Sequence, residues 1–363
     1  MKIVIACTSA GAGHLKAAEA IYNYFLGKNP SQDLVLVDIL EESHFLFGNF
    51  YSRGYSFMVN HAQWLWRFIF HITSQKNLQP ALTKVRTLNN RLNTRNFRQY
   101  LIQANPEIII STHYLTANIA SNLKKKSRIT SKLVTVITDF GVHPFWIYDK
   151  TDLYAVASDS SRQELVKLGI PADKIRVTGI PVDPKFSGGF NKLELRKKFD
   201  LDPQKFTVLV VTGSFGIGPI EQIVDLLQGQ VQVLAVCAKN EKLFARLKAK
   251  DYSEVKVFGF VDNIDELMAV SDLIVTKPGG LSISELLAME LVPVFISAIP
   301  GQEAQNIKVL AKYGIGERAQ DADKVRKIVL DYLKSPQKLQ AAKARIAQMR
   351  KPNAAEEIYR ALR

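Results

Sequence analysis

Cysteine is scarce in this 363-residue chain, and the scarcity excludes several classes of protein. The two cysteines, Cys7 and Cys237, both lie in apolar, strand-like runs. Such use argues against a disulfide framework or a zinc site and indicates a reducing compartment. We therefore expect both thiols to be small residues of a hydrophobic core.

Long hydrophobic runs are also missing. No apolar stretch approaches the roughly 20 residues that a helix needs to cross a bilayer, so we expect no transmembrane span. The apolar start, residues 3–7, is shorter than the roughly 7 to 15 residues of a signal-peptide core, and we interpret it as a first buried strand. The lack of a span leaves open an attachment to a membrane surface.

Acidic residues are almost absent between residues 43 and 138, where Glu107 is the single acid against 13 lysines and arginines. The whole chain carries a formal charge of +14, and ten aromatic residues stand between residues 45 and 70. Aromatic residues interleaved with cations, in a segment too polar to span, predict a surface for anionic membrane lipids. Our candidates for this contact are Phe57, Trp64, Trp66 and Arg67.

Two other interpretations of this basic block remain. It could be a solvated face over a buried aromatic core, or a groove for nucleic acid. The sequence contains no known nucleic-acid-binding motif, so we expect no nucleic-acid partner.

Strand-like and helical patterns alternate along the chain, which predicts an α/β fold with two doubly wound, Rossmann-like domains facing each other across a cleft. A break at residues 184–190 divides them. We expect a first domain over 1–184, a second over 190–340, and a C-terminal helix over 341–363 that could return to the first domain. The longest helical pattern of the first domain covers residues 82–103.

A glycine motif in the second half predicts an anion site. Lys277, Gly279 and Gly280 follow a β-branched run and open a helical one, where unpaired amides and the helix dipole favour a phosphate. We expect a diphosphate at this turn and at the next two residues, Leu281 and Ser282. Glu285, one turn on, would accept hydrogen bonds from ribose hydroxyls. The alternative is a tight turn whose acid merely complements the dipole.

Further loops are expected at the same edge of this sheet. Gly301, Gln302 and Glu303 follow the next strand, where open α/β sheets collect ligands, and the two polar side chains could bind sugar hydroxyls. A second set of candidate contacts to the nucleotide comprises Gly213, Ser214, Phe215, Gly216, Phe260 and Val261. The first four would form a glycine-rich turn, and the last two would contact the uracil base. Ordinary strand ends explain these residues nearly as well.

The first domain offers a candidate base. His14, with Gly13 before it, lies at the first strand-to-helix turn, and imidazole is suited to removing a proton from an attacking alcohol. A capping or core histidine is the alternative. Asp139 follows another strand together with His143 and Trp146. It could orient His14 or the acceptor hydroxyl, or it could cap a turn.

These motifs, in this order and through nearly the whole chain, resemble the monogalactosyldiacylglycerol synthase and processive diacylglycerol glucosyltransferase family, a sister group of the lipid II N-acetylglucosaminyltransferase. The resemblance implies a GT-B fold and transfer with inversion from UDP-glucose or UDP-galactose to diacylglycerol or a glycosylated diacylglycerol. It implies that the first domain binds acceptor and membrane and that the second binds the UDP-sugar, at the cytoplasmic side of the cell membrane as a peripheral protein. The turn at Ser214 and Phe215 departs from the family pattern.

The resemblance also implies residue roles. His14 corresponds to the family's proposed base, Glu285 to its ribose ligand, and Gln302 and Glu303 to its sugar contacts. We expect no cofactor and no metal, because the helix start and Lys277 can carry the diphosphate charge. Two Asp-x-Asp triplets, at 200–202 and 321–323, are interpreted as surface acids.

Other functions remain possible from the sequence. A lipid-linked N-acetylglucosamine transferase, a soluble UDP-hexosamine epimerase and a non-catalytic UDP-sugar sensor would all need the same nucleotide pocket. The basic aromatic block favours a membrane enzyme over the epimerase.

Overall fold

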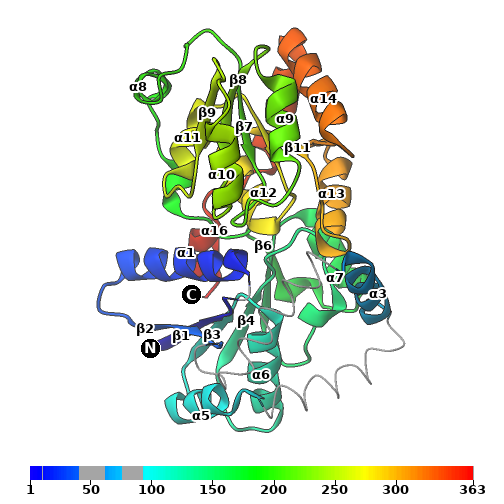
Figure 1. Ribbon diagram of the computed structural model, residues 1–363. Helices are drawn as coiled ribbons and strands as arrows, with labels where there is room; N and C mark the ends of the chain where they lie inside the picture. The colour runs from blue at the N-terminus through cyan, green and yellow to red at the C-terminus, as the bar shows by residue number, and fades with distance from the viewer. Residues whose placement is uncertain (10, 41–61, 76–92, 363) are drawn as a thin grey trace. The chain divides into compact units, whose positions relative to one another are not determined.

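A computed structural model describes residues 1–9, 11–40, 62–75 and 93–362 of the protein (Figure 1). The chain divides into two compact units. Unit 1 comprises Met1–Asp183, Ile299–Asn306 and Asn353–Arg363, and unit 2 comprises Pro184–Ala298 and Ile307–Pro352. Two short stretches of the C-terminal half thus cluster with the N-terminal half.

Unit 1 is built on a parallel sheet of six strands in the described residues, in the order β2-β1-β3-β4-β5-β6. The strands are β1 (Lys2–Cys7), β2 (Asp33–Asp38), β3 (Ile108–Ser111), β4 (Lys132–Val136), β5 (Leu153–Val156) and β6 (Ile175–Val177). The helices are α1 (Ala12–Lys28), α3 (Gln63–Thr73), α5 (Arg95–Ala104), α6 (Tyr114–Lys125), α7 (Asp159–Lys167) and α16 (Ala354–Ala361). Most of these strands are apolar without interruption, as expected where helices cover both faces of a sheet.

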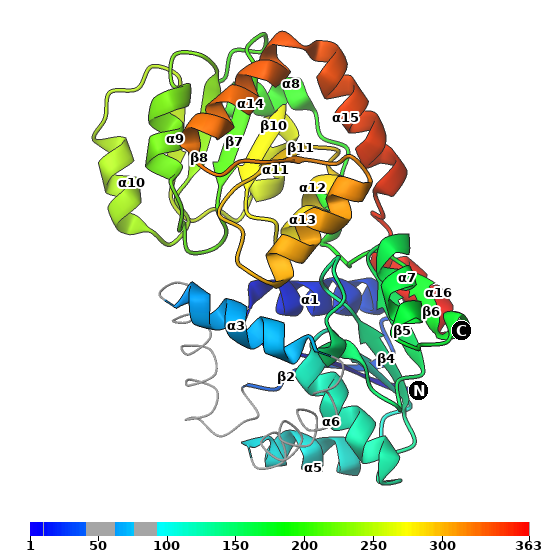
Figure 2. The same ribbon diagram turned by 90° about the vertical axis from the view of Figure 1, so that its right-hand side faces the viewer.

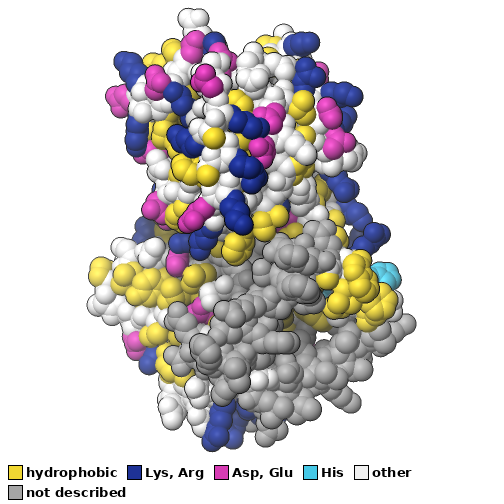
Figure 3. Space-filling view, viewed as in Figure 1, with side chains coloured by type: hydrophobic (Ala, Val, Ile, Leu, Met, Phe, Trp, Pro, Cys, Tyr) yellow, Lys and Arg dark blue, Asp and Glu magenta, His cyan; other side chains and the backbone are white. Residues whose placement is uncertain are grey.

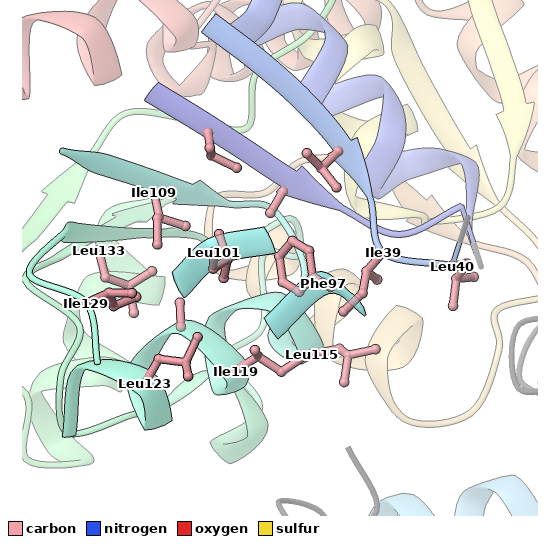
Figure 4. Close-up of a cluster of buried hydrophobic side chains, with 14 residues drawn as sticks. Ile39, Leu40, Phe97, Leu101, Ile109, Leu115, Ile119, Leu123, Ile129 and Leu133 are labelled. Atoms are coloured by element: carbon pink, nitrogen blue, oxygen red, sulfur yellow. The ribbon is translucent and has the colours of Figure 1, made fainter. Parts of the chain in front are cut away.

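Helices α5 and α6 cover one face of this sheet. Alternate residues of β1, such as Val4 and Ala6, join a buried cluster with Phe97 of α5 and Leu115 of α6 (Figure 4). The other face is covered by α1 and α16. There Ile3 and Ile5 of β1 pack with Ile21 and Phe25 of α1, in a cluster that also includes Ile358 of α16.

Unit 2 contains a second parallel sheet, again with six strands in the described residues and in the order β12-β11-β10-β7-β8-β9 (Figure 2). The strands are β7 (Thr207–Val211), β8 (Gln232–Val236), β9 (Val255–Phe258), β10 (Leu273–Thr276), β11 (Val292–Phe295) and β12 (Glu317–Arg318). The helices are α8 (Lys192–Lys198), α9 (Ile220–Leu227), α10 (Glu241–Lys248), α11 (Ile264–Val270), α12 (Gly280–Ala288), α14 (Ala322–Lys334) and α15 (Pro336–Met349). Helix α13 (Gln302–Lys312) begins in unit 1 and ends in unit 2.

Each sheet has one point where the strand order reverses. In unit 1 the first strand, β1, lies between β2 and β3, and in unit 2 the first strand, β7, lies between β8 and β10. Loops after the two strands at such a point diverge and leave room for a ligand at the carboxyl edge. The site residues should therefore be sought after β1 and β3 and after β7 and β10.

Two parallel sheets confirm the predicted α/β architecture, and burial confirms both cysteines as core residues. The helix expected over 82–103 is wrong at Thr94, where the backbone leaves helical geometry and a new helix, α5, begins at Arg95. Residues 76–92 lie outside the described part. Strand β12 was missed, because two polar residues at a sheet edge carry no apolar pattern.

Candidate active site

His14 lies in the first turn of α1, which follows β1, and is held by residues of the loops after β3 and β4. Its Nδ1 is 3.0 Å from the carbonyl oxygen of Thr112 and 2.8 Å from the hydroxyl of Thr138. The Thr112 hydroxyl in turn donates to the carbonyl of His14 at 2.9 Å. Because a carbonyl oxygen only accepts, Nδ1 must carry the proton, and the lone pair of the neutral ring lies on Nε2.

The surroundings keep this ring neutral. Burial lowers the pKa of His14 from 6.5 to about 4, against a smaller opposite effect of its hydrogen bond to Thr112. Part of the residue nevertheless stays accessible. The imidazole is therefore in the proton-accepting form at neutral pH, with the accepting nitrogen fixed by the backbone.

His113 is a residue that the sequence analysis missed. It is the N-cap of α6, it is 3% exposed, and its Nδ1 accepts a hydrogen bond from the Leu115 amide at 3.2 Å. Its ring meets that of His14 edge to face, with centroids 4.6 Å apart. Burial and the charge of His14 hold the pKa of His113 well below its usual value. The signal available in the sequence was its position directly after a buried strand.

Trp146 and His143 lie inside unit 1. Trp146 is 3% exposed and stands 6.2 Å from the ring of His14, between ring centroids. His143 accepts a hydrogen bond at Nδ1 from the Phe145 amide and packs against Phe70 of α3, with centroids 4.6 Å apart. Gly13, half-buried in the first turn of α1, directly precedes His14.

Asp139 is paired with Asn306, which lies in the second turn of α13. The Asn306 amide donates to the Asp139 carboxyl at 3.1 Å, and its oxygen accepts from the amides of Phe140 and Gly141 at 2.8 and 3.1 Å. Burial raises the pKa of Asp139 to about 7, with a further rise from Glu303 and an opposite effect of Asn306. The described hydrogen bonds thus join His14 to Thr112 and Thr138, and Asp139 to Asn306. None of these bonds joins Asp139 to His14.

The turn before α13 belongs to unit 1. The Glu303 carboxylate accepts from the Ile299 amide at 2.7 Å, and the residue is 8% exposed. Gly301 has φ +97°, and a Cβ there would lie 2.6 Å from the ring of Phe70. Gln302, the first residue of α13, is half-buried. The turn thus packs against α3 and lies on the same unit as His14.

Helix α12 begins directly after β10, at the strand reversal of unit 2. Its N-cap, Gly279, offers no side chain to the first turn, so the amides of Gly280, Leu281 and Ser282 have no side-chain cap. Lys277 precedes this turn and Glu285 follows in the next, and both are half-buried. A helix start of this kind, flanked by a cation and an acid, suits a phosphate with a neighbouring hydroxylated sugar.

The glycine-rich loop after β7 shares this edge of the sheet. A Cβ at Gly216, where φ is +58°, would lie 2.1 Å from the carbonyl oxygen of Cys237, so only glycine fits. Gly213 has φ +82°, and Ser214 accepts from the Lys239 amide at 3.3 Å. Phe215 on this loop and Phe260 after β9 are about equally exposed, at 60% and 61%, and Val261 beside Phe260 is half-buried.

Comparison with known proteins places these features in a family. Residues 14–182 match the model of monogalactosyldiacylglycerol (MGDG) synthase, and residues 207–358 match that of the glycosyltransferase family 28 C-terminal domain. A processive diacylglycerol β-glucosyltransferase of Staphylococcus haemolyticus is 30% identical over 94% of this chain and 86% of its own length. This chain belongs to the monogalactosyldiacylglycerol synthase and diacylglycerol glucosyltransferase family. The enzyme of the same name from Bacillus cereus is 29% identical over 98% of this chain and 92% of its own length.

Solved structures confirm that this family member has the GT-B fold of glycosyltransferases. HepE of Anabaena, crystallised with UDP, has a TM-score of 0.58 at 17% identity, over 100% of this chain and 99% of its own. MurG of Acinetobacter baumannii has a TM-score of 0.57 at 13% identity, over 98% and 97%. At these identities the likeness concerns the fold.

Helix α3 of this glycosyltransferase exposes an aromatic face. Trp64 is 74% and Phe68 58% exposed, and Arg67 and His71 are exposed on the same face at helical spacing. Hydrophobic side chains gather over α3 beside a histidine in Figure 3. Trp66 is half-buried, and Phe57 lies outside the described residues. None of the helices in the described ranges has the length and apolar character of a membrane span.

The acidic triplets take part in local contacts. Asp200 pairs with Lys256 at 2.6 Å, and Asp321 caps α14 by accepting from the Lys324 amide at 2.7 Å. In the part of the chain that the structure describes, no three His, Cys, Asp or Glu side chains form a group suited to a metal ion.

Proposed function

We propose that this protein is a peripheral membrane glycosyltransferase that moves a hexose, glucose or galactose, from its UDP derivative to diacylglycerol or a glycosylated diacylglycerol, with inversion. The observation that carries the proposal is the fixed tautomer of His14. A ring whose Nδ1 proton is bound to the Thr112 carbonyl presents Nε2 as a proton acceptor at a ligand-binding edge.

The reaction is a single displacement. The acceptor oxygen forms a bond to the anomeric carbon while its proton passes to Nε2 of His14. The bond from the anomeric carbon to the phosphate oxygen breaks, and its electron pair leaves with UDP. Attack on the side opposite to the leaving group inverts the configuration. A positioned base of this kind contributes typically about 10² to 10⁴-fold in rate.

Unit 2 binds the donor. The uncapped amides of α12 and the Lys277 ammonium take the diphosphate charge that develops as UDP leaves, and Glu285 binds the ribose hydroxyls. With this charge carried by the protein, the reaction proceeds without a metal ion. Activity that EDTA abolishes and Mg²⁺ restores would contradict this part of the proposal.

The acceptor enters from the membrane. The relatives are named for diacylglycerol, and α3 exposes Trp64, Arg67 and Phe68, a combination that suits the headgroup region of an anionic bilayer. The protein accordingly works at the cytoplasmic surface of the cell membrane. Trp64→Ser with Phe68→Ser should reduce flotation with anionic liposomes, whereas Val166→Ser, at a similarly apolar exposed site on α7, should not.

The decisive experiment incubates the purified protein with diacylglycerol liposomes and either UDP-glucose or UDP-galactose, and then separates the lipids by chromatography. A new glycolipid with one donor is the expected result, and its anomeric configuration by NMR tests inversion. If neither donor yields a glycolipid, although the protein binds UDP in calorimetry, the proposed transferase activity is refuted.

A further inference from the structure

The second buried imidazole beside the base, His113, has a donor atom that no described residue uses. Its Nδ1 accepts from the Leu115 amide, so in the neutral ring the proton lies on Nε2. Within the described ranges, no residue accepts a hydrogen bond from this Nε2. The residue is only 3% exposed, but Nε2 is not among the buried side-chain atoms of the described residues that lack a partner, so this donor keeps accessible surface at which a ligand can accept a hydrogen bond from it.

The two imidazoles have opposite tautomers. His14 carries its proton on Nδ1 and accepts at Nε2, whereas His113 accepts at Nδ1 and donates at Nε2. Their rings are edge to face with centroids 4.6 Å apart, and both follow strands at the reversal point of the unit 1 sheet. The pair therefore offers one acceptor and one donor on two rings that contact each other.

We propose that His113 donates from Nε2 to the oxygen on the carbon next to the attacked hydroxyl, so that the two imidazoles together recognise a 1,2-dioxygenated acceptor. The inference rests on the proposed function and adds a substrate-positioning residue to it. In diacylglycerol the free hydroxyl has the ester oxygen of the neighbouring carbon in this relation. The hydroxyls of a hexose have such a neighbour too, so one element serves both acceptors.

The hydrogen bond orients the acceptor rather than moving a proton. Its proton stays on His113, and the acceptor hydroxyl still gives its own proton to His14. The hydrogen bond from His113 to the neighbouring oxygen restricts rotation about the carbon–carbon bond of the acceptor. The hydroxyl then gives its proton to His14 while the lone pair that attacks points away from that ring. Positioning of this kind acts mostly on acceptors that possess the second oxygen.

The test uses His113→Asn, because an asparagine side chain still accepts from the Leu115 amide and preserves the cap of α6. Two matched soluble acceptors are compared, a medium-chain primary alcohol and the same alcohol with an ether oxygen on the second carbon. We expect the wild type to favour the ether alcohol by about tenfold in kcat/KM, and the variant to lose this preference while turning over the plain alcohol at a similar rate.

Several results would overturn the inference. Equal losses on both acceptors would make His113 a purely structural residue, and a wild type without preference would remove the recognition itself. The tautomers give a readout independent of activity: ¹⁵N NMR of the labelled protein should show Nε2–H for His113 and Nδ1–H for His14, and Nδ1–H at His113 would refute the proposal. Transfer to either acceptor by the wild type still supports the proposed function, so the two can fail separately.

Discussion

At the scale of single residues, the proposed acceptor site contains two imidazoles whose proton positions are set by the backbone. The Thr112 carbonyl fixes one ring and the Leu115 amide fixes the other. Neither ring needs a carboxylate partner to choose its tautomer. Burial then keeps both neutral, because an imidazolium loses more hydration than a neutral ring on leaving water.

Replacing His14 by Ala should lower kcat by about 10² to 10⁴-fold and leave UDP affinity unchanged, because the proposed donor site lies on unit 2. Steady-state assays and calorimetry with UDP measure the two effects. In the wild type, NMR titration of His14 should give a pKa near 4, so the base is lost only as the pH falls through about 4. A fully active variant, or a pKa near 6.5, would contradict the assignment.

Asp139 predicts a pH dependence of stability. Its pKa in the folded protein is about 7 against 3.8 in the reference state, so folding favours the protonated form. The stability from this proton is complete below about pH 4 and is lost as the pH rises through about 7. Asp139→Asn should therefore gain stability relative to the wild type across this range, by on the order of 2 to 4 kcal/mol.

Chemical denaturation at pH 4, 5.5 and 8 measures the gain. Asp149→Asn serves as the control, because this carboxylate is 75% exposed and pairs with Lys125 at the surface. A stability difference between Asp139→Asn and the wild type that does not change with pH would rule out the raised pKa.

At the scale of elements, α3 has one face exposed to solvent and one face packed against the rest of unit 1. Trp64 and Phe68 point to solvent, and Phe70 packs on His143 and against the turn at Gly301. The helix therefore connects an exposed apolar surface with the turn that the sequence assigns to sugar binding. The phenyl ring of Phe70 packs directly against the backbone of this turn and leaves no room for a side chain at residue 301, which explains the glycine there.

Gly301→Ala should disturb this contact. The new Cβ would lie 2.6 Å from Phe70, and φ +97° is strained for alanine, so we expect a loss of about 2 to 4 kcal/mol in stability and a lower kcat. Gly169→Ala is the matched control, because φ there is +94° and no atom lies within 4 Å. Thermal unfolding of both variants separates the clash from the backbone strain, and equal losses would show that the Phe70 contact is unimportant.

At the scale of the whole molecule, unit 1 is assembled from three separate parts of the chain. The last helix, α16, packs on α1, where Tyr359 meets Phe25 edge to face with centroids 4.9 Å apart. Ile358 is fully buried in the cluster beneath the sheet. The C-terminus is thus part of the fold of the N-terminal unit.

Ile358→Ala should therefore destabilise unit 1, by about 2 to 5 kcal/mol. Hydrogen exchange should show faster opening of the amides of α1 and β1 than in the wild type. Val166→Ala, at a residue of unit 1 that is 45% exposed, should change little. Unaltered exchange in α1 would mean that α16 contributes nothing to this core.

The sequence by itself determined the features that local pattern encodes. Uninterrupted apolar runs such as 108–111 and 273–276 gave the parallel strands, and alternation with helices gave two α/β sheets. The glycines before α12 and His14 after β1 identified the carboxyl edge of each sheet, because turns from a strand into a helix have a characteristic residue pattern. The family resemblance followed from the order of these motifs.

Only the tertiary structure decided which residues of distant segments meet. It brought Thr112 and His113 to His14 and Asn306 to Asp139, across separations of about 100 residues or more, and it placed residues 299–306 and 353–363 in unit 1. No local pattern encodes these contacts, because the order of strands in a sheet, not their order in the chain, sets which loops are neighbours.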